Sequence, residues 1–276
     1  MTSVNTNGSA ITALQNLNAT VAQLAETQTR VSTGLKVASA KDNGAIWAIA
    51  QNKRSGILAL DQVKDSLNRA QSTVDVAVSA GQSISDLLNQ MKAKALAATD
   101  NSLDTNSITA LANDFKALRD QIGKIVANAD FNGANMIKTG GSSVFALANA
   151  AGTNKLTVAA VNLGLGGGTV TVTAAGTFTT NATASAQLAL VAASITNVNA
   201  AVAKLGTGST AVQTHLSFIS KLQDTLTTGV GNLVDADVAK ESANLTALQT
   251  KQQLGVQALS IANNAPQFLL SLFQGH

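Results

Sequence analysis

Residues 60–95 read LDQVKDSLNRAQSTVDVAVSAGQSISDLLNQMKAKA, and the spacing of apolar residues in this stretch predicts the fold. Apolar or small residues recur in it at alternating steps of three and four positions. That spacing puts them on one face of an α-helix, as in the contact line of a coiled coil, which we call a seam. A helix of this length spans about 54 Å. The seam residues are Leu60, Val63, Leu67, Ala70, Val74, Ala77, Gly81, Ile84, Leu88, Met91 and Ala95.

Four further stretches repeat this spacing and predict more amphipathic helices. They cover residues 14–35, 108–125, 188–226 and 234–262. The register holds through Gly206 and Gly208, which predicts continuous helix there, although each glycine costs about 1 kcal/mol relative to Ala. The last seam is the weakest, because it has polar residues at several of its positions.

The middle of the chain has a different pattern. Residues 138–180 are rich in Gly and Thr and carry few charges. Lys155–Val158 and Thr169–Thr173 alternate with the period of two that half-buried strands show, and Gly164–Gly168 predicts a turn between them. The expected fold is therefore mainly α: a long antiparallel helical coiled-coil rod with paired terminal helices and a small Gly/Thr-rich β excursion.

Composition excludes several classes of protein. The chain has 276 residues, no Cys, 12% charged residues and a net charge of +3, and its basic residues form no run. These features rule out a disulfide scaffold and argue against nucleic acid as a partner. Polar residues interrupt each long uncharged stretch, so we expect no membrane insertion. Residues 1–25 lack the basic and continuously apolar regions of a cleaved signal peptide.

Residues that could carry chemistry are scarce. The two histidines, His215 and His276, are far apart in sequence and form no metal-ligand pair. The glycine run at 164–168 lacks the Lys-Ser/Thr of a phosphate-binding loop. We therefore expect no enzyme activity, no cofactor, and no catalytic or metal-binding residues. His215 occupies a seam position and is expected to pack, and Asp237 is expected to cap a helix.

Several segments resemble bacterial flagellin, in the right order and at both ends of the chain. They are Val4–Asn7 (VNTN), Arg30–Lys36 (RVSTGLK), Ser39–Asn43 (SAKDN), Ala48–Ala50 (AIA), Ala129–Gly133 (ADFNG), Asp235–Asp237 with Glu241, and Ile261–Phe273 (IANNAPQFLLSLF). Trp47 departs from the small or Leu residue usual in the family. The middle segment carries no recognisable signature, as is usual where flagellins vary.

The resemblance implies a subunit that assembles into the helical flagellar filament for swimming motility. It implies a filament core made from residues 1–33 and 240–276, and linkers at 34–46 and 234–239. A helical rod would comprise 47–137 and 184–233, with a variable outer β segment at 138–183. Two alternatives stay open: a hook–filament junction protein with flagellin-like termini, and a secreted coiled-coil interaction protein.

The resemblance also implies partners and a location. The subunit would form a homopolymer outside the cell after export without a cleaved signal peptide. The flagellar export apparatus, a chaperone, a cap and hook-junction proteins would be its other partners.

Two sets of residues are candidates for contacts. Alone, the terminal helices would each expose an apolar stripe and be marginally stable, so they need partners from this chain or from neighbouring copies. The expected assembly core pairs Leu14, Leu17, Val21 and Leu24 with Leu245, Leu248, Leu259 and Leu269.

Residues 88–94 resemble the flagellin segment read by an animal receptor, and the corresponding face carries Gln90, Met91, Lys92 and Lys94. Gln90 and Ala93 replace the family's Arg and Glu there, so we expect weak or no receptor activation.

Overall fold

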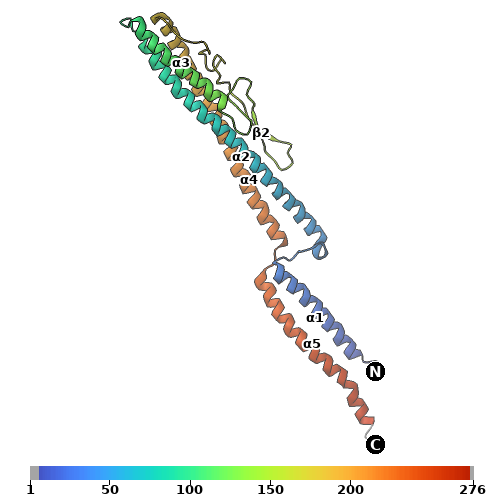
Figure 1. Cartoon of the computed structure of the whole chain (residues 1–276). Helices are drawn as coiled ribbons and strands as arrows, with labels where there is room; N and C mark the ends of the chain where they lie inside the picture. The colour runs from blue at the N-terminus through green and yellow to red at the C-terminus, as the bar shows by residue number, and fades with distance from the viewer. Residues whose placement is uncertain (1–5, 274–276) are drawn as a thin grey trace. The chain divides into compact units, whose positions relative to one another are not determined.

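The computed structural model describes residues 6–273, and the side chains of residues 6–264. Its helices are α1 (Gly8–Thr33), α2 (Ala40–Ala97), α3 (Thr105–Asn128), α4 (Asn181–Val234) and α5 (Val238–Phe273) (Figure 1). Two short strands, β1 (Val144–Leu147) and β2 (Lys155–Val158), precede α4. The chain forms two compact units: a helical unit, Gly56–Asp224, and a terminal unit, Met1–Ser55 with Thr225–His276. The predicted linkers fall within the terminal unit.

The core of the helical unit is the seam of α2. Every residue of the seam predicted between Leu60 and Ala95 is buried, which confirms that prediction. Polar pairs tie α2 to α4: Gln223 Nε2 donates to Asp61 Oδ1 (2.7 Å), and Ser85 Oγ donates to Asn199 Oδ1 (2.9 Å). These pairs run in opposite sequence directions, so α2 and α4 are antiparallel.

Helix α3 packs beside them and holds part of the loop before α4. Asp104 caps α3 by accepting a hydrogen bond from the backbone N–H of Ser107 (2.9 Å). Phe115 meets Phe178 edge to face, with ring centroids 5.3 Å apart. The buried Arg119 donates from Nη1 to the carbonyl oxygen of Gly176 (2.7 Å). The loop is therefore fixed by both an aromatic contact and a charged hydrogen bond.

The two strands form an antiparallel hairpin, but not the predicted one. Lys155–Val158 is a strand as expected, and its partner is Val144–Leu147. The prediction of a strand at Thr169–Thr173 is wrong, since only an isolated bridge joins Leu165 to Val170. This segment bonds to α4 instead of to a strand: the N–H of Thr171 donates to Ser194 Oγ, and the hydroxyl of Thr171 donates to the Leu190 carbonyl.

Helix α4 is continuous through both glycines, as predicted. At Gly208, a Cβ would lie only 2.6 Å from Val158 Cγ1, so the missing side chain lets β2 approach the helix. His215 packs as expected. Its Nε2 lies 2.9 Å from the carbonyl oxygen of Ala148, which holds the hairpin loop against α4.

In the terminal unit, the two linkers bind each other. We call residues 34–37 and 234–236 the linker clasp. The N–H of Lys36 donates to the Val234 carbonyl (2.7 Å), and the N–H of Ala236 donates to the Gly34 carbonyl (2.8 Å). Gly34 ends α1 in the left-handed conformation, with φ 70°. Asp237 Oδ1 accepts from the N–H of Lys240, which confirms the predicted cap of α5.

Candidate assembly surface

Helices α1 and α5 lie side by side as the terminal helix pair (Figure 1). The side-chain amide of Asn7 donates to the carbonyl oxygen of Ala262 (2.6 Å). Arg30 Nη1 lies 3.5 Å from Glu241 Oε1 near the other end of the pair. Between them, a Cβ at Gly255 would lie 3.2 Å from Leu17 Cδ1, so the two backbones approach closely there.

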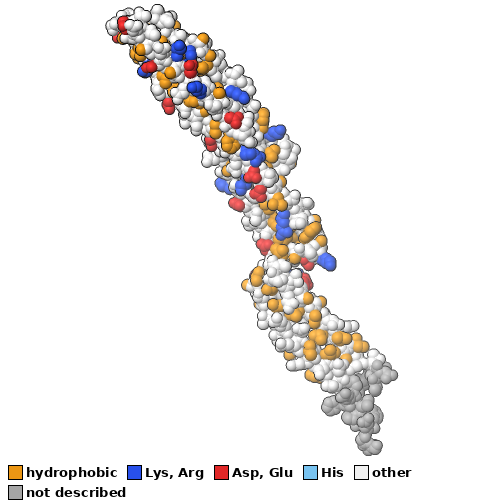
Figure 2. Space-filling model, in the orientation of Figure 1, with side chains coloured by type: hydrophobic (Ala, Val, Ile, Leu, Met, Phe, Trp, Pro, Cys, Tyr) orange, Lys and Arg blue, Asp and Glu red, His pale blue; other side chains and the backbone are white. Residues whose placement is uncertain are grey.

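Two helices cannot bury all of their apolar residues against each other. On α5, Leu254 is 59% exposed and Ile261 is 72% exposed. Figure 2 shows apolar side chains gathered on the visible face of the pair. The exposed large apolar residues of the pair are Ile11, Leu14, Val21, Val238, Leu254, Val256 and Ile261. Exposed large apolar side chains gathered in this way mark an interaction site.

The residues predicted for the assembly core divide into two groups. Leu24 is buried, whereas Leu14 and Val21 are 46% and 41% exposed, so these two stay largely free of α5. Leu17, Leu245, Leu248 and Leu259 are half-buried. Leu269 lies in α5, outside the residues whose side chains are described. Sequence reasoning missed Leu254, Val256 and Ile261, because they lie off the seam. The sequence signal that could have identified these three residues is that they are large and apolar but lie outside the seam.

The receptor-like face is less exposed than its sequence suggests. Gln90 and Lys92 are exposed, but Met91 is fully buried in the seam of α2. Including Met91 in an exposed face was therefore wrong, because its heptad position places it in the buried seam. Lys94 Nζ pairs with Asp114 Oδ2 on α3 (2.8 Å). The weak receptor response stays a prediction.

Among the described residues, Asp104 shows how capping a helix changes the pKa of a carboxylate. Hydrogen bonds from Ser107, from its hydroxyl and then its backbone N–H, lower the pKa of Asp104. Within the described part of the chain, no three His, Asp or Glu side chains gather as metal ligands would. Helix α4 is long and apolar enough to span a membrane by composition. Of the apolar window in this helix, 28% is buried, and the buried residues Val191, Val198 and Leu205 belong to the predicted seam.

Comparison with known proteins gives consistent matches. The N-terminal helical region of bacterial flagellin matches residues 4–142, and the C-terminal helical region matches 188–273. The flagellin FljN of Caulobacter vibrioides is 54% identical over 274 residues, covering 99% of both chains. A flagellin of Brucella melitensis is 37% identical over 284 residues, covering 100% of both.

Solved structures share the fold at lower identity. Bacillus cereus flagellin aligns with a TM-score of 0.50 and 21% identity, over 56% of this chain and 88% of that one. A structure described as a flagellar hook-associated protein from Vibrio parahaemolyticus aligns with a TM-score of 0.58 and 16% identity. It covers 70% of this chain and 100% of that one. At such identities only the helical architecture is shared.

The long helices, the exposed apolar face of the terminal pair and these matches define a structural protein of the bacterial flagellum. Both ends match the flagellin models, and full-length relatives are more than half identical. The chain belongs to the bacterial flagellin family. It is a structural subunit of the extracellular flagellar filament rather than an enzyme, and the junction-protein alternative is not favoured.

Proposed function

We propose that the exposed apolar residues of the terminal helix pair carry the contacts between subunits in the filament. The observation behind this proposal is the exposure of Leu254 and Ile261, which α1 leaves uncovered. Transfer of such side chains from water to an interface is worth about 25 cal/mol for each Å² of apolar surface. Repeated in every subunit, this burial favours the polymer.

The substitution Leu254→Asn tests this proposal. It removes the apolar surface without adding a charge, and the exposed position leaves the α1–α5 contact intact. We expect monomers with unchanged helicity that polymerise at least tenfold less readily, measured as critical concentration by sedimentation and electron microscopy. Gln253→Asn on the same helix is the matched control and should assemble normally. Normal filaments from Leu254→Asn would refute the assignment.

Leu248→Asp tests the interior of the pair. This half-buried residue belongs to the predicted assembly core. A carboxylate there would be desolvated against α1, so the pair should open and assembly should stop, while the helical unit keeps its fold.

The other partners follow from family membership. We infer from membership of the flagellin family that the subunit reaches the cell exterior through the flagellar export apparatus, without cleavage of a signal peptide. A chaperone that binds near the C-terminus, a cap and hook-junction proteins would be its further partners. The apolar face of α5 supports a chaperone, since it needs cover before assembly.

A further inference from the structure

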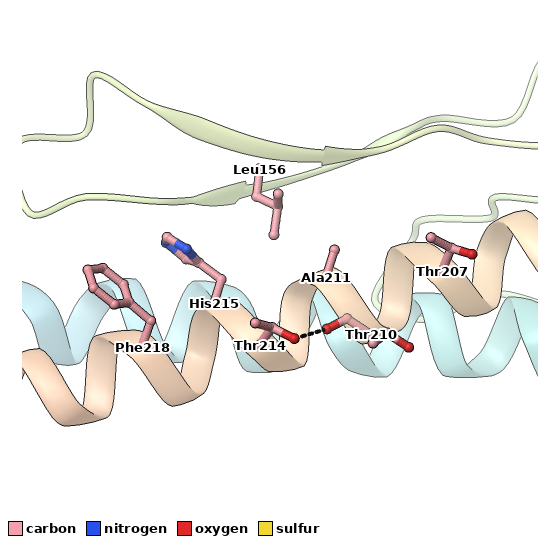
Figure 3. Close-up of a pocket in the computed structure, with 7 residues that line it drawn as sticks. All are labelled: Leu156, Thr207, Thr210, Ala211, Thr214, His215 and Phe218. Carbon is pink, nitrogen blue, oxygen red and sulfur yellow. Dashed lines mark hydrogen bonds between the residues drawn. The ribbon is translucent and has the colours of Figure 1, made fainter.

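A shallow groove of about 550 Å³ lies between α4 and β2 in the helical unit. In Figure 3, Leu156 points from the strand toward α4, while His215 and Phe218 rise from α4 toward the hairpin side. The rings of His215 and Phe218 lie 5.8 Å apart at their centroids. This groove is distinct from the surface of the terminal helix pair.

The polar groups of the groove are already occupied. The hydroxyls of Thr207, Thr210 and Thr214 each donate to a carbonyl oxygen four residues earlier in α4, at 2.8–3.0 Å. His215 Nε2 is paired with the Ala148 carbonyl oxygen. Few donors remain for a polar ligand, so the groove suits an apolar side chain.

The segment of α4 that lines the groove carries no charge of its own. Residues 205–220 of α4 contain no Lys, Arg, Asp or Glu. Phe218 is nonetheless 54% exposed at one end of the groove. Covering this stretch with protein would desolvate no charged side chain of α4 itself; the nearby carboxylate of Asp75 on α2 accepts a hydrogen bond from Ser209.

An exposed apolar side chain of a size that suits the groove lies on the opposite face of the hairpin. Phe145 pairs with Thr157, and Ala146 pairs with Leu156. Because neighbouring strand residues point to opposite faces, Leu156 faces the groove while Phe145 faces away from it. Phe145 is 62% exposed. Residues 139–154 carry no charge, but Lys155 lies on the same face of the hairpin as Phe145, and Arg69 of α2 lines the same hollow as Phe145. Phe145 therefore cannot reach the groove of its own subunit.

We propose that Phe145 of one subunit inserts into the α4 groove of a second copy of this chain. An open helical polymer needs contacts between two unlike surfaces, and the outer hairpin face and the groove supply such a pair. Each surface carries an exposed phenylalanine, the donors of the groove are satisfied, and the groove segment of α4 carries no charge, while Lys155 lies on the hairpin face of Phe145. The inference rests on the polymerisation proposed above, at a separate contact.

Cysteine cross-linking tests this contact, because the natural chain has no Cys. One chain carries Thr157→Cys, beside an intact Phe145, and another carries Thr210→Cys in the groove. Mixed filaments treated with a short bismaleimide should give dimers, whereas either chain alone and the unpolymerised mixture should not. The control replaces Thr210→Cys with Gln82→Cys on the exposed surface of α2 and should give none. Filaments of the mixture without dimers, or with no more than the control, would overturn the inference while leaving the terminal-pair proposal intact.

If a cysteine variant fails to assemble, a double-mutant cycle tests the contact between Phe145 and the groove instead. Phe145→Ala and Phe218→Ala should each raise the critical concentration about tenfold, and the double variant should raise it no further than either alone. Leu96→Ala removes a similarly exposed apolar side chain elsewhere and should leave assembly unchanged. Fully additive effects, or none, would overturn the contact. Wild-type chains that form no filaments would instead refute the polymer function itself.

Discussion

At the scale of single residues, Asn7 shows how one side chain joins two helices. Its Oδ1 caps α1 by accepting from the N–H of Ala10, and its Nδ2 donates to the Ala262 carbonyl oxygen. Pro266 lies four residues after Ala262 and has no N–H, so it leaves that carbonyl without its helical partner. The chain's one proline therefore creates the acceptor that Asn7 fills.

The variant Asn7→Asp isolates the donor. A carboxylate still caps α1 but cannot donate to Ala262, so we expect the α1–α5 contact to weaken by about 1 kcal/mol. Pro266→Ala restores a backbone donor for that carbonyl, and in that background Asn7→Asp should cost less. Hydrogen exchange of α1 and α5 amides measures both effects. Equal costs in the two backgrounds would show that Pro266 and Asn7 are unconnected.

Gly208 and Gly206 form a matched pair in α4. A Cβ at Gly206 meets nothing within 4 Å, whereas one at Gly208 meets Val158 at 2.6 Å. Gly206→Ala should stabilise the chain by up to about 1 kcal/mol through helix propensity. Gly208→Ala should destabilise it by about 1–3 kcal/mol, because the hairpin must move. Urea unfolding compares the two, and equal stabilisation would mean that the hairpin is not seated on α4.

At the scale of elements, the linker clasp is followed directly by a charged cap. Asp42 Oδ2 accepts from the N–H groups of Ser39 (2.8 Å) and Ala38 (3.0 Å). The backbone N–H of Ser39, followed by the Ser39 hydroxyl and the Ala38 N–H, lowers the pKa of Asp42 below 3.8. Its stabilising effect is thus complete above the ordinary Asp pKa and disappears as the pH falls through the lowered value.

Acid titration should therefore loosen the start of α2. Trp47, the chain's one tryptophan, reports on this segment by fluorescence. We expect a transition below pH 3.8 in the wild type that is absent from Asp42→Asn. A transition of the same midpoint in both proteins would assign it to other carboxylates.

The elements differ in how far sequence predicts them. The α2 seam was fully predictable, because one buried face repeats for many turns and each residue reinforces the register. The Val144–Leu147 strand was not, since four successive apolar residues hide the alternation. Thr169–Thr173 alternates well but binds Leu190 and Ser194 of α4, so a tertiary contact overrides its strand pattern. In the assembly surface, the helices were predictable, whereas the exposure of Leu254 depends on how α1 and α5 pair.

At the scale of the whole molecule, the two units differ in what covers their apolar residues. The helical unit buries its seam against its own helices, with Leu67, Val74 and Leu88 fully inaccessible. The terminal helix pair leaves Leu254 and Ile261 in water. Local stability follows such burial, so the terminal pair should open far more often than the helical unit.

Polymerisation should remove that difference. In monomers, amides of α1 and of α5 up to residue 264 should exchange much faster than those of the α2 seam, whereas in filaments all should exchange slowly. Trypsin should correspondingly cut monomers at Arg30, Lys36, Lys240 or Lys251, and leave a helical fragment that cannot polymerise. The Arg30 site should be cut last, because its guanidinium pairs with Glu26 and Glu241. Equal protection of α1 and α5 in monomer and filament would mean that the pair is complete within one chain, and the exposed leucines would then need another explanation.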